Sequence, residues 1–172
     1  MAEIMRRVAR LRVPLGYALG AVAFWFAEPT SRSIAVGAAV GAAGEAVRIW
    51  AAGHLEKGRE VTTTGPYAVT RHPLYLGSTI MGAGLAIAAN SLLVTLIVAG
   101  YLAITITAAI RSEEAHLTDK FGAHYPAYRD GTATRGAQSF SLDRAMRNRE
   151  YRALLGLLVV LALLAAKGAL RR

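Results

Sequence analysis

The sequence predicts an all-α integral membrane protein, a polytopic helical bundle of about five transmembrane helices. Of the 172 residues, 54% are hydrophobic, the formal charge is +9, and the basic residues lie in blocks between long uncharged runs. A nucleic-acid-binding protein would instead spread Lys and Arg over one face of amphipathic elements, so we expect no nucleic-acid partner. The chain has no cysteine, which excludes disulfides and thiolate zinc sites, and we expect no bound metal.

The first two apolar runs cover residues 13–27 and 33–53. The first is slightly short for a span of about 20 residues. It resembles a signal peptide, but no convincing small-residue cleavage site follows, so we expect a retained first helix. The second is rich in Gly and Ala, which allow close helix packing in lipid. Its Glu45 and Arg48 are three apart and share one helix face, as in an ion pair at the membrane boundary.

The next two runs, residues 74–89 and 92–110, predict a tight helical hairpin. Only Asn90 and Ser91 separate them, which is too little for a domain linker. The last run, residues 153–170, is the most lipid-like of the five.

The distribution of Lys and Arg predicts the orientation. Basic residues precede the first run and fill the 54–73 and 111–152 segments, so these segments and the N-terminus should be cytoplasmic. Five spans would place the C-terminus outside the cell. The basic residues Lys167, Arg171 and Arg172 argue against that location, so the last helix could instead be interfacial. We treat residues 1–172 as one domain, and almost all of its polar segments should face the cytoplasm.

The loop before the third apolar run is unusually polar and stiff. Gly65-Pro66 predicts a turn, and Pro73 suits the first turn of a helix. A residue before proline is extended, so His72 should project from the loop. The helix N-terminus near Tyr75 favours an anionic partner. The alternative is a membrane-entry cap, with basic and aromatic side chains at headgroup level: Arg71, His72, Tyr67 and Tyr75.

A carboxylate pair, Glu113 and Glu114, follows the fourth run. Adjacent side chains on a helix diverge by about 100°, so a cation partner suits them better than a catalytic dyad. The alternative is a solvated helix end. Because the pair and the loop around His72 lie on the same side of the hairpin, they could close over a cofactor that carries both a carboxylate and a positive charge.

These motifs resemble the membrane methyltransferases of the isoprenylcysteine carboxyl methyltransferase and phospholipid N-methyltransferase type. The resemblance covers residues 48–129. The matching residues are Gly65, Tyr67, Arg71, His72, Pro73, Tyr75, Gly77, Glu113, Glu114, Leu117, Phe121, Gly122, Tyr125 and Tyr128.

The resemblance implies a methyltransferase with S-adenosyl-L-methionine as cofactor, held in a cytosolic cofactor pocket. It also implies a lipophilic acceptor, a lipid amine, carboxyl or thiol, drawn from the membrane lipid. The implied cofactor-binding residues are Arg59, Glu60, Val61, Thr62, Tyr67, His72, Pro73, Leu74, Tyr75 and Glu113. The implied catalytic residues are His72, Glu114 and Tyr75. His72, Glu114 and His54 are the candidate bases for an amine or thiol acceptor.

Two departures from the family pattern bear on the substrate. The isoprenylcysteine enzymes have an arginine one turn before the first Glu, where this chain has Ala109, and Arg111 points about 160° away from Glu113. Arg59 stands where the eukaryotic enzymes have His. Cofactor binding is therefore better supported than a carboxyl substrate.

Two other classes of function stay open, a membrane reductase that uses a nicotinamide cofactor and a small non-catalytic membrane protein. The abundance of Ala and Arg is typical of a prokaryotic protein, which predicts the inner membrane as its location. The glycine-rich helices could form a homodimer or could pack internally.

Overall fold

A computed structural model of the chain describes residues 16–134 and 136–171. Within these ranges the protein is helical and contains no β-strand. The part of the first predicted span that covers residues 13–15 lies outside them. The helices are Gly16–Phe26, α2 (Ser31–His54), the 3₁₀ helix η1 (Gly65–Ala68), α3 (Pro73–Ala89), α4 (Leu92–Phe121), α5 (His124–Arg129), α6 (Leu142–Arg147) and α7 (Tyr151–Leu170).

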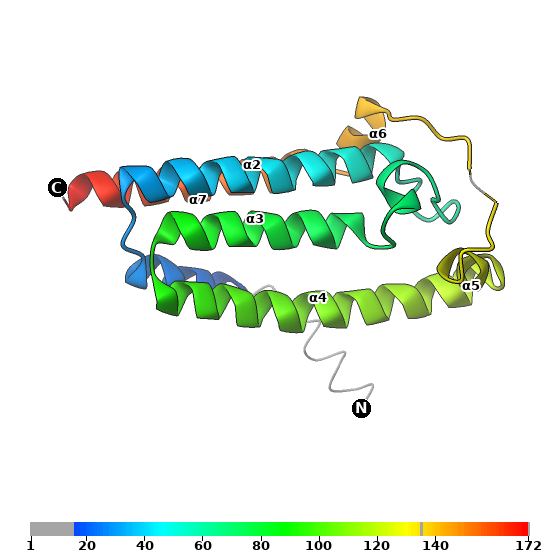
Figure 1. The fold of residues 1–172 in the computed structure, drawn as a ribbon, viewed down its shortest axis with the longest axis horizontal. Coiled ribbons are helices and arrows are strands. Elements are labelled where there is room, and N and C mark those ends of the chain that lie inside the picture. Colours follow the sequence, from blue (N-terminus) through cyan, green and yellow to red (C-terminus); the bar gives the residue numbers. More distant parts are fainter. Residues whose placement is uncertain (1–15, 135, 172) are drawn as a thin grey trace.

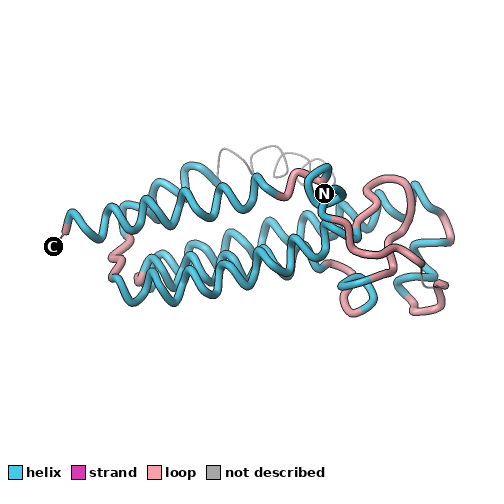
Figure 2. The backbone as a smooth tube through the Cα atoms, turned by 90° about the horizontal axis from the view of Figure 1, so that it is seen from above, coloured by secondary structure: helices cyan, strands magenta, loops and turns pink. Residues whose placement is uncertain are grey.

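The long helices run side by side along one axis (Figure 1). The hairpin between α3 and α4, the start of α2 and the C-terminus lie at one end of the bundle. The segment between α2 and α3 and the short helices α5 and α6 lie at the other end, where most of the loops gather (Figure 2). The two predicted polar segments therefore meet at one end, which we call the loop end.

Among the described residues, three helices are long and apolar enough to cross a membrane: α2, α4 and α7. The helix Gly16–Phe26 and α3 are apolar but shorter. The predicted apolar run of residues 92–110 forms the first part of α4, which continues through Glu113 and Glu114 to Phe121 and ends where Gly122 adopts a φ of 53°. Its last turns are polar, so the helix extends beyond the apolar span.

Glycines bring α2 and α3 into close contact. A Cβ atom at Gly84 would lie 2.5 Å from the Gly41 nitrogen and 2.6 Å from the Gly37 carbonyl oxygen, which is closer than real Cβ contacts. Only residues without a side chain allow the two backbones to approach in this way. These glycines pack inside the chain, and the homodimer stays a prediction.

The tip of the hairpin is fixed by its two polar residues, as the two-residue spacing predicted. Asn90 adopts the left-handed conformation with φ 51°, and Ser91 caps the N-terminus of α4. Asn90 also donates to the Glu28 carbonyl at 3.1 Å, while the Glu28 N–H donates to the Ala89 carbonyl at 2.8 Å. These bonds hold the connection between the first two helices against the hairpin.

Cations of α7 satisfy carbonyl groups at the end of the first helix. The Lys167 ammonium group donates to the Trp25 carbonyl at 2.7 Å and lies 5.0 Å from the ring centroid of Phe24. Arg171 donates to the Ala27 carbonyl at 3.3 Å. Helix ends leave carbonyls unpaired, and cations are favourable there. Lys167 and Arg171, the charges that argued against a spanning last helix, thus bind the end of the first helix.

We predict that Gly84→Ala lowers the free energy of unfolding by about 1–3 kcal/mol, because the new methyl group overpacks the contact between α2 and α3. Gly100→Ala is the matched control, since nothing lies within 4 Å of a Cβ there, and it should be neutral or stabilising by up to about 1 kcal/mol. Denaturant unfolding in mixed micelles, followed by circular dichroism, measures both. Equal effects would contradict the close packing.

Candidate active site

A cavity of about 630 Å³ lies at the loop end, between the segment after α2, the start of α3, the last turns of α4, and α5. This volume is within the range of about 300–1,000 Å³ of small-molecule sites. The residues that line the cavity are Arg48, Leu55, Glu56, Lys57, Gly58, Glu60, Val61, Thr62, Tyr67, Arg71, His72, Pro73, Leu74, Tyr75, Ala109, Ser112, Glu113, His116, Leu117, Lys120, Phe121, Tyr125 and Tyr128.

The turn at Gly65 places Tyr67 in the cavity wall. Gly65 has a φ of 57°, and a Cβ there would lie 2.6 Å from the His54 ring, so a side chain is excluded on two grounds. Tyr67 is buried in the following 3₁₀ helix, and its carbonyl accepts a bond of 2.6 Å from the Tyr128 hydroxyl. Burial, and then the nearby charge of Glu113, raises the pKa of the Tyr67 phenol, which therefore stays neutral.

The start of α3 presents His72 and Tyr75 to the same cavity. Pro73 occupies the first turn and is fully buried, while His72 precedes the helix with φ −131° and ψ 56°, outside the helical region. This agrees with the expectation that His72 projects from the loop. The His72 and Tyr75 rings lie 5.9 Å apart between centroids.

Glu114 holds the histidine rather than lining the cavity. One of its oxygens, Oε1, lies 3.1 Å from His72 Nε2 and 3.5 Å from the Arg71 guanidinium, and it accepts a bond of 3.1 Å from the Tyr125 hydroxyl. Burial, followed by the Glu114 charge, raises the pKa of Tyr125 to about 12, so this phenol stays a donor. Glu114 thus has the cation partner that its sequence context predicted.

Glu113 faces the cavity, as its divergence from Glu114 requires. It is partly exposed and, within the described residues, it forms no ion pair. A carboxylate of this kind is free to meet an ammonium group or hydroxyl groups of a ligand.

The structure brings almost all the predicted site residues together. Arg59 differs, because it lines a neighbouring cavity of about 610 Å³ and not the first one. His54 does not line the cavity either, and its Nδ1 lies 3.0 Å from the Trp50 carbonyl, which favours a structural role. The predicted residues that line the 630 Å³ cavity are Glu60, Val61, Thr62, Tyr67, His72, Pro73, Leu74, Tyr75 and Glu113.

Arg48 is a cavity residue that we had assigned only to an ion pair. Its Nε lies 3.8 Å from Glu45 but 2.6 Å from Glu150 at the start of α7, and its Nη1 donates to Ser78 and to the Leu74 carbonyl. One arginine therefore ties α2 to α3 and α7 beside the cavity. Glu150, the closer partner, is 102 residues away in sequence. Helical spacing identifies only partners within a few residues, so the sequence analysis could not find this pair.

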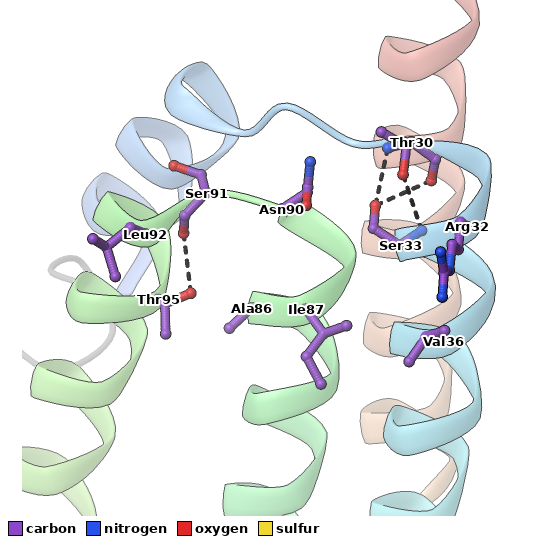
Figure 3. Close-up of a pocket in the computed structure, with 10 residues that line it drawn as sticks. All are labelled: Thr30, Arg32, Ser33, Val36, Ala86, Ile87, Asn90, Ser91, Leu92 and Thr95. Atoms are coloured by element: carbon purple, nitrogen blue, oxygen red, sulfur yellow. Dashed lines mark hydrogen bonds between the residues drawn. The ribbon is translucent and has the colours of Figure 1, made fainter.

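Another cavity, of about 500 Å³, lies at the opposite end of the bundle (Figure 3). It is formed around the hairpin tip and the start of α2, and among the described residues that line it only Arg32 is charged. Thr30 and Ser91 there use their side chains to cap their own helices. This cavity contains none of the predicted site residues.

A comparison with known protein families gives one match that covers more than half of the chain. The phospholipid methyltransferase family matches residues 11–124. The chain belongs to this family. The matched range includes His72, Glu113 and Glu114, and together with the three apolar helices it indicates an integral membrane protein.

Two curated relatives match a shorter part of the chain. The nickel-cobalt-cadmium resistance protein NccN of Alcaligenes xylosoxydans xylosoxydans is 37% identical over 76 residues, which is 43% of this chain and 36% of that protein. The cobalt-zinc-cadmium resistance protein CzcN of Cupriavidus metallidurans is 36% identical over 76 residues, 43% of this chain and 35% of that protein. The match thus spans about a third of each relative. No solved structure matches the chain significantly.

We predict that Glu150→Ala lowers the free energy of unfolding by about 3 kcal/mol, because it breaks a largely buried ion pair and leaves Arg48 with the more distant Glu45. Asp130→Ala is the control, since it breaks an exposed pair with Arg129 and should cost at most about 1 kcal/mol. Unfolding in mixed micelles at neutral pH compares the two. If Glu150→Ala costs no more than the control, the pair does not hold the helices together.

Proposed function

We propose that the protein is an S-adenosylmethionine-dependent methyltransferase that acts on a lipophilic acceptor at the cytosolic face of the membrane. The observation that carries the proposal is that His72 and Glu113, from segments far apart in sequence, line one cavity in a chain of the phospholipid methyltransferase family.

The residues of the cavity suit the chemical groups of this cofactor. Glu113 and Glu60 offer carboxylates for an ammonium group or ribose hydroxyls, and Lys57 and Lys120 offer cations for a carboxylate. Aromatic rings suited to stacking on an adenine stand in the same wall: Tyr67, Tyr75, Phe121, Tyr125 and Tyr128. The bound cofactor would supply a methyl group on a positively charged sulfur.

The protein's part in such a reaction is mainly positioning. A cavity that fixes the acceptor in line with the methyl group and excludes water needs no covalent intermediate on the enzyme. For an amine or thiol acceptor, His72 is the base that the geometry favours. Glu114 holds its Nε2 at 3.1 Å, which orients the ring and leaves Nδ1 to accept a proton. Glu114 is then a positioning residue.

A lipophilic acceptor is supported by an apolar groove between α3 and α4. The groove has a volume of about 360 Å³ and is lined mainly by small and aliphatic side chains. Thr79, at one end of it, donates to the carbonyl of the cavity residue Tyr75 at 2.9 Å. A hydrocarbon chain in the groove would therefore lead toward the cavity.

The proposed setting is the bacterial inner membrane, crossed by all five apolar helices, with the N-terminus and the loop end in the cytoplasm. The 17 residues of α3 reach about 25 Å at 1.5 Å per residue, which approaches the hydrocarbon thickness of about 30 Å. The arginine-rich loop end suits the cytoplasmic side.

We predict that the purified protein binds S-adenosylmethionine with micromolar affinity in detergent, and that Glu113→Gln weakens binding about 10- to 100-fold, because a charged hydrogen bond is lost. Isothermal titration calorimetry measures this. Asp119→Asn is the control, since Asp119 is an exposed carboxylate on the same helix that does not line the cavity. Titration with reduced nicotinamide adenine dinucleotide in the same calorimeter tests the alternative that the protein is a reductase. No binding at millimolar S-adenosylmethionine would contradict the proposal.

A further inference from the structure

The short helix α6 is fixed to the C-terminal end of α2. The Arg144 side chain lies 2.6 Å from both the Glu56 carboxylate and the Gly53 carbonyl. Asn148 donates to the Ala52 and Leu55 carbonyls, both at 2.9 Å. Because Leu55 and Glu56 also line the 630 Å³ cavity, α6 is bonded directly to the cavity wall.

The opposite face of α6 is apolar and exposed. Leu142 and Met146, four residues apart and so on one face, are 62% and 52% exposed. Tyr151 after the helix is 39% exposed. A soluble surface rarely keeps large apolar side chains together in this way.

The same segment carries unpaired positive charge. Arg147, Arg149 and Arg152 are exposed, and none of them forms an ion pair in the described part of the chain. Two acidic residues lie nearby. Glu150 is buried and held by Arg48, so only Asp143 opposes the three arginines at the surface.

The position of α6 along the bundle corresponds to the lipid headgroups. The 24 residues of α2 span about 36 Å, against a hydrocarbon thickness of about 30 Å. Since α6 lies beside the end of α2 (Figure 1), it falls at the edge of the hydrocarbon layer. Exposed apolar and arginine side chains at this depth are typical of interfacial helices.

We propose that these residues bind the anionic phospholipid headgroups of the leaflet that borders the cavity. We call them the α6 surface: Leu142, Met146, Arg147, Arg149, Tyr151 and Arg152. The apolar side chains enter the acyl boundary and the guanidinium groups meet lipid phosphates. This proposal concerns the binding of lipid headgroups, so its test does not depend on whether the protein binds the cofactor.

Binding at the α6 surface would set the depth of the cavity mouth. The bonds from Arg144 and Asn148 hold α6 and the Leu55–Glu56 wall as one unit. A headgroup contact at α6 therefore keeps that wall at the level of the lipid headgroups.

The test uses the full chain in dodecylmaltoside micelles, titrated with fluorescent short-chain phosphatidylglycerol or phosphatidylcholine. We expect phosphatidylglycerol to bind at least tenfold more tightly, since each arginine near an anionic surface adds roughly a further fivefold. The triple variant Arg147→Gln, Arg149→Gln, Arg152→Gln should lose the preference. The matched control, Arg32→Gln, Arg111→Gln, Arg129→Gln, makes the same change in net charge at exposed sites outside the α6 surface and should keep it.

A second variant tests the apolar part. Leu142→Asn with Met146→Asn should weaken the binding of both lipids while the preference for phosphatidylglycerol remains. The substituted side chains are exposed, so we expect each variant to keep its fold. Thermal unfolding of each variant checks this. Equal binding of the two lipids by the unmodified protein, or loss of the preference in the control triple variant, would overturn the proposal.

Discussion

The candidate site depends on the contact between His72 and Glu114. These residues are 42 positions apart, one before α3 and the other near the end of α4, and their side chains meet at 3.1 Å. With Arg71 and Tyr125 on the same carboxylate, the contact joins the loop, α4 and α5 around one cavity. Glu113, on the neighbouring face of α4, is thereby directed into that cavity.

The rest of the bundle supplies a rigid base for this contact. Glycines let α2 and α3 pack backbone to backbone, so the start of α3 has little freedom to move relative to the end of α2. Arg48 then connects both helices to Glu150 of the last helix. Because Glu150 lies outside the range matched by the phospholipid methyltransferase family, the family match alone does not reveal that α7 supports the cavity.

Local patterns in the sequence predicted much of this arrangement, and non-local contacts account for what they missed. Proline at the start of α3 and the two-residue hairpin predicted their elements closely, because each acts on adjacent residues. The 100° step between Glu113 and Glu114 predicted that the two side chains diverge, and only Glu113 lines the cavity. The Arg48–Glu150 pair and the place of Arg59 in a neighbouring cavity depend on packing between distant segments.

The most direct test of the account is transfer of the methyl group itself. The purified protein would be incubated with methyl-labelled S-adenosylmethionine and membrane lipids of the producing organism, and the label in the organic phase would be counted. The account predicts label in a lipid product, absent without protein and strongly reduced by Glu113→Gln. Label that never leaves the aqueous phase, from protein that binds the cofactor, would contradict methyl transfer to a lipophilic acceptor.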